Sequence, residues 1–240
     1  MKNPKIEIKR IQNFLMDTIR NTGTDGYVLG ISGGLDSSVL FKIIDGLPIK
    51  FIAVKMPIHS IREDEFDADT LVKDAKADIL RIDLTKIYDD MLALMPDSGN
   101  NLANSNLKPR LRMSTLYHIA QTNNLLVIGA TNKSEYLTGY FTKYGDSGVD
   151  VMPLREYLKF EIYEMARVLS VPDSILNKPP SAGLFKGQTD EEEMGIRYKD
   201  LDAYLCGQNV DEKTKNIAEN MLLKTNHKRN IPIFYKREEE

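Results

Sequence analysis

Residues 27–38 read YVLGISGGLDSS, and this stretch decides how the chain folds. Tyr27 to Ile31 is a short apolar run of strand formers, and Gly33 and Gly34 then allow backbone conformations that a side chain would forbid. A helical apolar pattern begins with Val39, directly after three residues with side-chain oxygens: Asp36, Ser37 and Ser38. A strand, a glycine turn and a helix N-terminus together are typical of a phosphate site, because free amide N–H groups and the positive end of the helix dipole face the anion.

Two better-known phosphate motifs are excluded at this turn. No lysine follows the glycines, so the Walker spacing is absent, and the G-x-G-x-x-G dinucleotide pattern is not satisfied either. An ordinary strand-to-helix turn with a capping serine is the plain alternative. Asp36 has two interpretations of its own, as a helix cap or as a Mg²⁺ ligand beside substrate phosphates, and the loop context favours the ligand.

Strand and helix patterns alternate through the first half of the chain. They predict helices at about 5–21, 36–45, 62–76, 84–95 and 110–121, strands at 27–31, 49–54, 79–82 and 125–129, and a polar, turn-rich segment at 96–106. The inner face of the 62–76 helix is expected to contain Phe66, Leu71, Val72 and Ala75. This alternation predicts an α/β fold with an open, Rossmann-like parallel sheet and helices on both faces. Two long loops, 140–153 and 177–190, are expected to serve the site if they follow the carboxyl ends of strands.

Composition narrows the function classes. The chain has 240 residues, 42% hydrophobic and 28% charged, which predicts one globular domain over 1–240. A net charge of −3 argues against nucleic acid as the main partner, and no apolar run is long enough for a membrane span. The one cysteine, Cys206, excludes an internal disulfide and favours a cytoplasmic location. It lies in the run AYLC, where core packing is the expected role rather than that of a reactive thiol.

Several motifs carry a resemblance to a known family. SGGLDS (32–37) resembles the pyrophosphate loop of the ATP pyrophosphatases, a superfamily with an adenine nucleotide alpha hydrolase-like fold. GATNKSEYLTGYFTKYGD (129–146) resembles the ammonia-dependent NAD synthetases within it. NLKPRLRM (106–113), PSAGLFKGQTDEEEMGIRY (180–198) and NHKR (226–229) are similar to further motifs of that family, in the same order.

The resemblance implies an activity: ATP-dependent amidation of deamido-NAD by ammonia, through an adenylated carboxylate, with release of AMP and diphosphate. Since Cys206 is not expected to be a glutaminase nucleophile, free ammonia, or ammonia from a separate protein, is the expected nitrogen donor. It implies ATP contacts at Gly30, Ile31, Ser32, Gly33, Gly34, Leu35, Asp36, Ser37, Lys55, Ala130, Lys159 and Ser181. It implies deamido-NAD contacts at Arg110, Lys143, Asp150, His227 and Lys228. Asp36 and Glu135 would hold Mg²⁺, Asp36 and Lys159 would be catalytic, and the protein would be a homodimer with the deamido-NAD pocket near the interface. Our own expectation, beyond the resemblance, is that residues 96–106 and the Arg110 helix form part of the contact.

The chain also departs from the family pattern. Ala130 stands where the family commonly has threonine, and Gly183 stands where it commonly has an acidic residue. Lys55 replaces a frequent arginine, and Pro109 replaces the usual alanine. A tRNA-modifying sulfur transferase of the same superfamily is the first rival, but it would need catalytic cysteines and a basic face. A regulatory protein that binds ATP without turnover is the second, and Ala130 and Gly183 are the hints in its favour.

Overall fold

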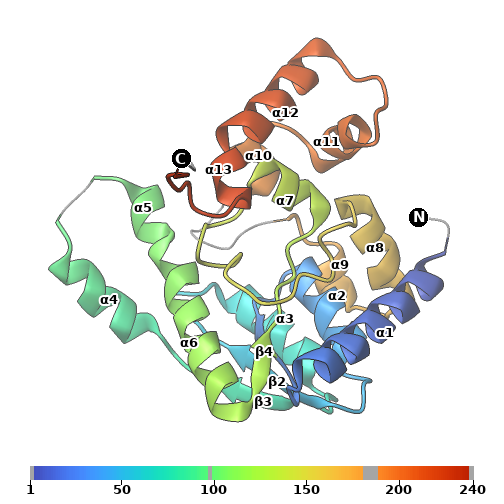
Figure 1. Cartoon of the computed structure of the whole chain (residues 1–240), viewed down its shortest axis with the longest axis vertical. Helices are drawn as coiled ribbons and strands as arrows, with labels where there is room; N and C mark the ends of the chain where they lie inside the picture. The colour runs from blue at the N-terminus through green and yellow to red at the C-terminus, as the bar shows by residue number, and fades with distance from the viewer. Residues whose placement is uncertain (1–2, 97–98, 181–188, 238–240) are drawn as a thin grey trace.

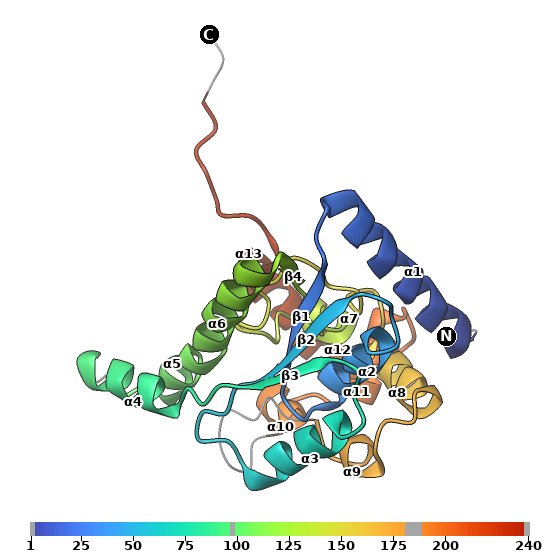
Figure 2. The same ribbon diagram turned by 90° about the horizontal axis from the view of Figure 1, so that it is seen from below.

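A four-stranded parallel sheet forms the centre of the computed structural model, which describes residues 3–96, 99–180 and 189–237. The strands are β1 (Gly26–Ile31), β2 (Lys50–Lys55), β3 (Asp78–Arg81) and β4 (Leu125–Val127). Their order across the sheet is β3-β2-β1-β4, so β1 lies between β2 and β4. The predicted open α/β sheet is confirmed, with helices on both of its faces (Figures 1 and 2).

The side chains of β1 alternate between two cores. Tyr27, Leu29 and Ile31 pack with helices α1 (Pro4–Thr22), α2 (Leu35–Ile44), α3 (Arg62–Val72) and α8 (Lys159–Val168). Val28 faces the other side, against α4 (Thr85–Leu94) and α6 (Leu107–Asn123). The alternation is the ordinary two-residue period of a strand that is buried on both faces, and it makes β1 the most enclosed strand of the sheet.

A smaller helical layer lies over the carboxyl edge of the sheet (Figure 1). Its elements are α7 (Lys133–Thr138), α10 (Asp190–Met194), α11 (Tyr198–Leu205), α12 (Glu212–Lys224) and α13 (Asn226–Arg229). Its own core contains Met194, Tyr198, Leu201 and Ala218. The two remaining short helices are α5 (Asn101–Ser105) and α9 (Asp173–Leu176). Among the described helices, none is both long and apolar enough to cross a membrane.

Some sequence predictions were wrong in detail. The predicted helix at 62–76 ends at Val72, and Phe66, expected on its inner face, is 67% exposed. Leu71, Val72 and Ala75 do pack against the core, together with Ala68. Asp67 is buried next to Phe66 and accepts from Lys178 Nζ at 3.0 Å, a pairing with a residue far along the chain. The turn-rich segment contains the helix α5, whose start is capped by the Asn100 side chain. Cys206 is exposed, because α11 ends at Leu205 and Gly207 turns the chain away with φ +74°.

Candidate functional site

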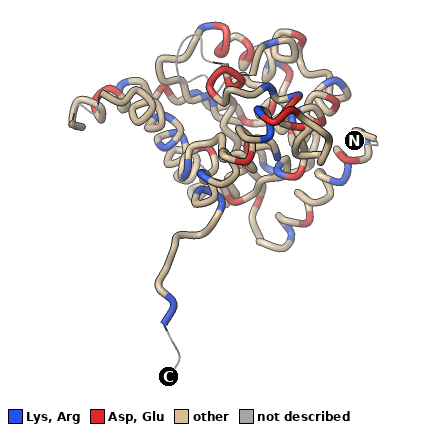
Figure 3. The backbone as a smooth tube through the Cα atoms, turned by 90° about the horizontal axis from the view of Figure 1, so that it is seen from above, with Lys and Arg blue, Asp and Glu red and all other residues tan. Residues whose placement is uncertain are grey.

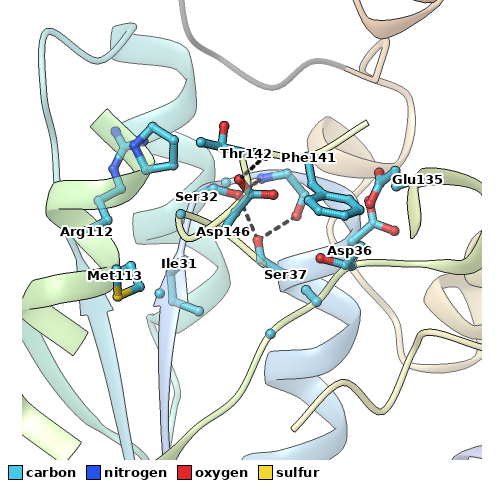
Figure 4. Close-up of a pocket in the computed structure, with 18 of the residues that line it drawn as sticks. Ile31, Ser32, Asp36, Ser37, Arg112, Met113, Glu135, Phe141, Thr142 and Asp146 are labelled. Carbon is cyan, nitrogen blue, oxygen red and sulfur yellow. Dashed lines mark hydrogen bonds between the residues drawn. The ribbon is translucent and has the colours of Figure 1, made fainter. Parts of the chain in front are cut away.

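The predicted phosphate loop connects β1 to α2 and is held by its own serines. Ser32 Oγ accepts from the Gly34 amide at 3.2 Å and lies 3.0 Å from Ser37 Oγ. The Gly34 carbonyl accepts from Ser37 and Ser38 hydroxyls at 3.0 and 2.8 Å, which closes the first turn of α2. The loop lines a cavity of about 730 Å³ at the carboxyl ends of the strands. All eight predicted residues from Gly30 to Ser37 line it (Figure 4).

Gly33 is the position in this loop where a side chain cannot be accepted. Its φ is +82°, and a Cβ there would lie 2.5 Å from the Asp64 carbonyl oxygen. We expect Gly33→Ala to lower the free energy of unfolding by roughly 1–3 kcal/mol and to abolish ATP binding, because the loop must move to relieve the clash. Urea denaturation and titration calorimetry with ATP measure the two effects.

Gly46 is the matched control for that substitution. An added Cβ at Gly46 meets nothing within 4 Å, so Gly46→Ala should leave ATP affinity unchanged. Wild-type ATP affinity in Gly33→Ala would contradict the assignment of the loop.

Two carboxylates from different elements meet at one ammonium beside the loop. Lys159 Nζ, at the start of α8, lies 2.5 Å from Asp36 Oδ2 and 3.3 Å from Glu135 Oε1. The Lys159 side chain is 3% exposed, and those of Asp36 and Glu135 are 16% exposed. The structure therefore brings together three residues that lie far apart in the sequence, and all three line the cavity.

Burial and charge shift the pKa values of this cluster. Burial, with the charge of Asp36, raises the pKa of Glu135 to about 8, although Lys159 acts in the opposite direction. Burial alone would lower the pKa of Lys159, but the carboxylates of Asp36 and Glu135 outweigh it and raise that pKa. Burial also raises the pKa of Asp190, which accepts from Tyr198 OH at 3.1 Å. Tyr198 OH lies 3.4 Å from Glu135 Oε1 as well, so one tyrosine connects the two acids.

Asn132 orients both carboxylates and was not among the predicted site residues. Its side chain caps α7 by accepting from the Glu135 amide at 3.0 Å, and it donates to Asp36 Oδ1 at 2.8 Å. Glu135 Oε2 accepts from the Asn132 amide at 3.3 Å, which leaves Oε1 directed at Lys159. The Asn-x-x-Glu spacing at 132–135 is a capping-box pattern and was the available signal.

The predicted Mg²⁺ site can be tested against the charges of these side chains. Asp36, Glu135 and Asp190 are carboxylates, whereas Lys159 is the cation that pairs with the first two. The burial of Glu135 and the nearby charge of Asp36 disfavour the ionised form of Glu135, and a divalent ion beside the two acids would offset that effect. Within the described parts of the chain, no three acidic, histidine or cysteine side chains form a metal-binding group. Two carboxyl side chains, Asp36 and Glu135, are nevertheless a donor set that suits Mg²⁺, since this ion binds through one or two carboxylates and completes its shell with phosphate and water.

Four of the five predicted deamido-NAD residues gather on another part of the same cavity. Arg110, Lys143, His227 and Lys228 all line it. Lys143 Nζ donates to the His227 carbonyl at 2.6 Å, and an Arg110 guanidinium nitrogen donates to the Lys143 carbonyl at 3.3 Å. Lys228 Nζ donates to the carbonyls of Gly139 and Phe141 at 2.7 and 2.8 Å. The C-terminal helix α13 and the 140–153 loop are joined by these bonds.

The other predicted contacts are placed differently. Asp150 does not line the cavity; its carboxylate accepts from Tyr117 OH at 3.0 Å and from the Val127 amide at 2.8 Å. Lys55 and Ala130 line the cavity, and Lys55 Nζ forms an ion pair with Asp69. Ser181 and Gly183 lie outside the described residues.

Comparisons with known proteins agree with this geometry. The family model NAD synthase matches residues 7–236. The NH(3)-dependent NAD(+) synthetase of Finegoldia magna is 43% identical over 91% of this chain and 91% of its own length. The solved NMN synthetase of Francisella tularensis has a TM-score of 0.95 and 34% identity, and the match covers 98% of this chain and 99% of that one. The NH3-dependent NAD synthetase of Campylobacter jejuni has a TM-score of 0.82 and 27% identity over 98% and 99% of the two chains. On the family match and these relatives, the chain belongs to the NAD synthase family.

Proposed function

We propose that this protein is a ligase that amidates deamido-NAD with ammonia at the expense of ATP, releasing AMP and diphosphate. The observation that carries the proposal is one cavity that holds the glycine loop, the Asp36–Lys159–Glu135 cluster and the cations of α13. Membership of the NAD synthase family implies ATP, deamido-NAD and ammonia as the substrates. Residues 1–240 would act as one domain, in the cytoplasm where ATP is abundant.

The chemistry needs an activated acid. A carboxylate resists attack by ammonia, because its negative charge repels a nucleophile and oxide is a poor leaving group. Transfer of AMP to the carboxylate removes the charge and supplies a good leaving group, after which ammonia attacks the carbonyl carbon. No nucleophilic side chain is required, so the protein contributes positioning and charge stabilisation.

Each part of the cavity has a role in that scheme. The amides of Gly33 and Gly34 would bind the polyphosphate, and the Lys159 ammonium would stabilise charge on the phosphate under attack. Arg110, Lys143, His227 and Lys228 would bind deamido-NAD. Mg²⁺ held by Asp36 and Glu135 would neutralise charge on the phosphates.

Release of AMP and diphosphate is the test. The protein is mixed with ATP, Mg²⁺, ammonium and deamido-NAD, and AMP, diphosphate and NAD are measured by chromatography. We expect AMP, diphosphate and NAD in equal amounts, and we expect no product when deamido-NAD is omitted. ATP binding without AMP release would favour the regulatory rival, and AMP release that depends on tRNA would favour the sulfur-transferase rival.

A second candidate is amidation of nicotinate mononucleotide, the corresponding mononucleotide acid. The favouring observation is the TM-score of 0.95 with an NMN synthetase, against 0.82 with the Campylobacter NAD synthetase. The curated relatives at 38–43% identity are NAD synthetases, which keeps deamido-NAD as the first candidate. The ratio of kcat/KM for the two acids decides between them.

A homodimer is part of the proposal. Apolar side chains are exposed on α4 and α5, with Leu94 85%, Ile87 56% and Leu102 50% exposed. These helices project from the body beside α6, the helix that contains Arg110 (Figure 2). An apolar surface of this kind is typical of a protein interface.

Leu102→Glu is expected to weaken that dimer at least about 100-fold, because burial of an unpaired carboxylate is costly. Sedimentation equilibrium measures the dissociation constant. Leu223→Glu, at a 77% exposed position on α12, is the control and should leave assembly unchanged. A monomeric wild type would contradict the homodimer.

A further inference from the structure

Arg112 is a cation of the cavity to which the proposed function assigns no role. It lies on α6, two residues after Arg110, and lines the same cavity as the phosphate loop. Its Nε donates to the Met56 carbonyl at 3.0 Å. Over the described residues, this is the one hydrogen bond of the guanidinium, so the four N–H donors on its two terminal nitrogens have no protein acceptor there.

The position is poorly solvated for a charge. Burial lowers the pKa of Arg112, although the charges of Asp146 and Asp64 oppose that effect. An arginine keeps its proton in a protein regardless, so a poorly hydrated cation remains. A cation removed from water without a partner costs free energy, and stability alone therefore gives no reason for Arg112.

The nearest acids are engaged elsewhere. Asp146 Oδ1 accepts from the Thr142 amide at 2.9 Å, and Asp64 forms an ion pair with Lys178. In the described structure, neither comes within ion-pair distance of Arg112. Two other cations of the cavity have more partners, because Lys159 pairs with two carboxylates and Lys228 donates to two carbonyls.

Arg112 also lies apart from the acidic cluster. In Figure 4 it is on one side of the cavity, Ser32 and Ser37 are in the middle, and Asp36 and Glu135 are on the other side. A nucleotide whose phosphates rest on the loop would thus have the carboxylates on one side and a guanidinium on the other. The two terminal nitrogens of a guanidinium match the two oxygens of a phosphate or carboxylate.

We propose that Arg112 is an anion-binding residue of this cavity, which holds a phosphate or carboxylate group of a bound substrate through its two terminal nitrogens. This inference rests on the proposed function, which brings a polyphosphate and a carboxylic acid into the same cavity. The Met56 carbonyl fixes the Nε side of the guanidinium and so presents the opposite edge to the substrate. The residue holds the anion in place during AMP transfer.

Arg112→Ala and Arg112→Lys test the proposal. If the anion is a phosphate of ATP, calorimetry without the acid shows ATP binding weakened roughly 10- to 100-fold in Arg112→Ala. If the anion belongs to the acid substrate, ATP binding is unchanged and KM for the acid rises by the same factor. Arg112→Lys retains a point charge but not the paired donors, so it should recover only part of either loss. Arg20→Ala is the control, at an exposed arginine on α1 that pairs with Asp17.

Rescue of Arg112→Ala by guanidinium ion distinguishes an anion-binding role of Arg112 from a purely structural one. Millimolar guanidinium should restore the affected constant in Arg112→Ala, because the ion can occupy the space that the side chain leaves. The proposal is overturned if both constants stay within about threefold of wild type, or if they change only together with a lower melting temperature and without rescue.

If the proposed function itself is wrong, the measurements differ from those expected when only the Arg112 proposal is wrong. Wild-type protein would then release no AMP with either acid, while ATP, inorganic diphosphate and deamido-NAD could still be titrated into wild type and Arg112→Ala. Equal binding of all three ligands by the two proteins would overturn the anion site in that case too.

Discussion

Asp36→Asn is expected to lower the rate of AMP release at least about 1000-fold while the protein stays folded. The Asp36 carboxylate is the group closest to Lys159 and also accepts from Asn132, so it positions a cation and an amide at the mouth of the phosphate loop. The fold should survive because Lys159 keeps Glu135 as a partner at 3.3 Å. AMP release under saturating ATP and acid measures the loss, and circular dichroism checks the fold.

The matched control is an aspartate at the other end of the same helix. Asp45 Oδ1 accepts from the amides of Lys76 and Ala77 at 2.9 and 2.8 Å, outside the cavity. Asp45→Asn should therefore reduce stability slightly and leave AMP release within about twofold of wild type. If Asp36→Asn retained wild-type turnover, the assignment of Asp36 as a catalytic and metal-binding residue would be wrong.

Local patterns predicted the sheet and the loop well, because both depend on neighbours in the sequence. The run of apolar strand formers before Ser32 predicted a buried strand, and the two glycines predicted a turn after it. The alternation of strand and helix predicted a parallel sheet with helices on both faces, but the order β3-β2-β1-β4 came from the structure, because alternation alone is compatible with several strand orders. Lysines and arginines are interspersed with aspartates and glutamates along the backbone (Figure 3), and the net charge of the sequence is −3.

Contacts between distant residues were harder to predict. Phe66 is exposed while its neighbour Asp67 is buried and paired with Lys178, which lies more than 100 residues later, and helical periodicity contains no information about that pair. Lys159 entered the predictions through family resemblance alone, since a lysine at the start of a helix has no local feature that marks it as buried. Tyr198 and Asp190 were missed for the same reason: their hydrogen bond to each other and the contact with Glu135 depend on tertiary structure.

Lys159 is the residue on which the acidic cluster depends for its charge balance. Its ammonium contacts Asp36 and Glu135, and the charge of Asp190 acts on it as well. Its side chain also lies over the Tyr198 ring, 4.9 Å from the ring centre. Removal of one partner from a buried ion pair leaves an uncompensated charge, which costs far more than the pair itself contributes.

Lys159→Met should therefore lower the free energy of unfolding by about 3–5 kcal/mol and lower AMP release at least about 100-fold. Urea denaturation measures the first effect. Mg²⁺ should raise the melting temperature of the variant more than that of wild type, because the divalent ion replaces the missing charge. Lys133→Met is the control, since its ammonium lies 3.9 Å from Glu156 with both side chains partly exposed, and it should cost less than about 1 kcal/mol. Wild-type stability in Lys159→Met would show that the three carboxylates do not need this cation, and the proposed charge balance of the site would then be wrong.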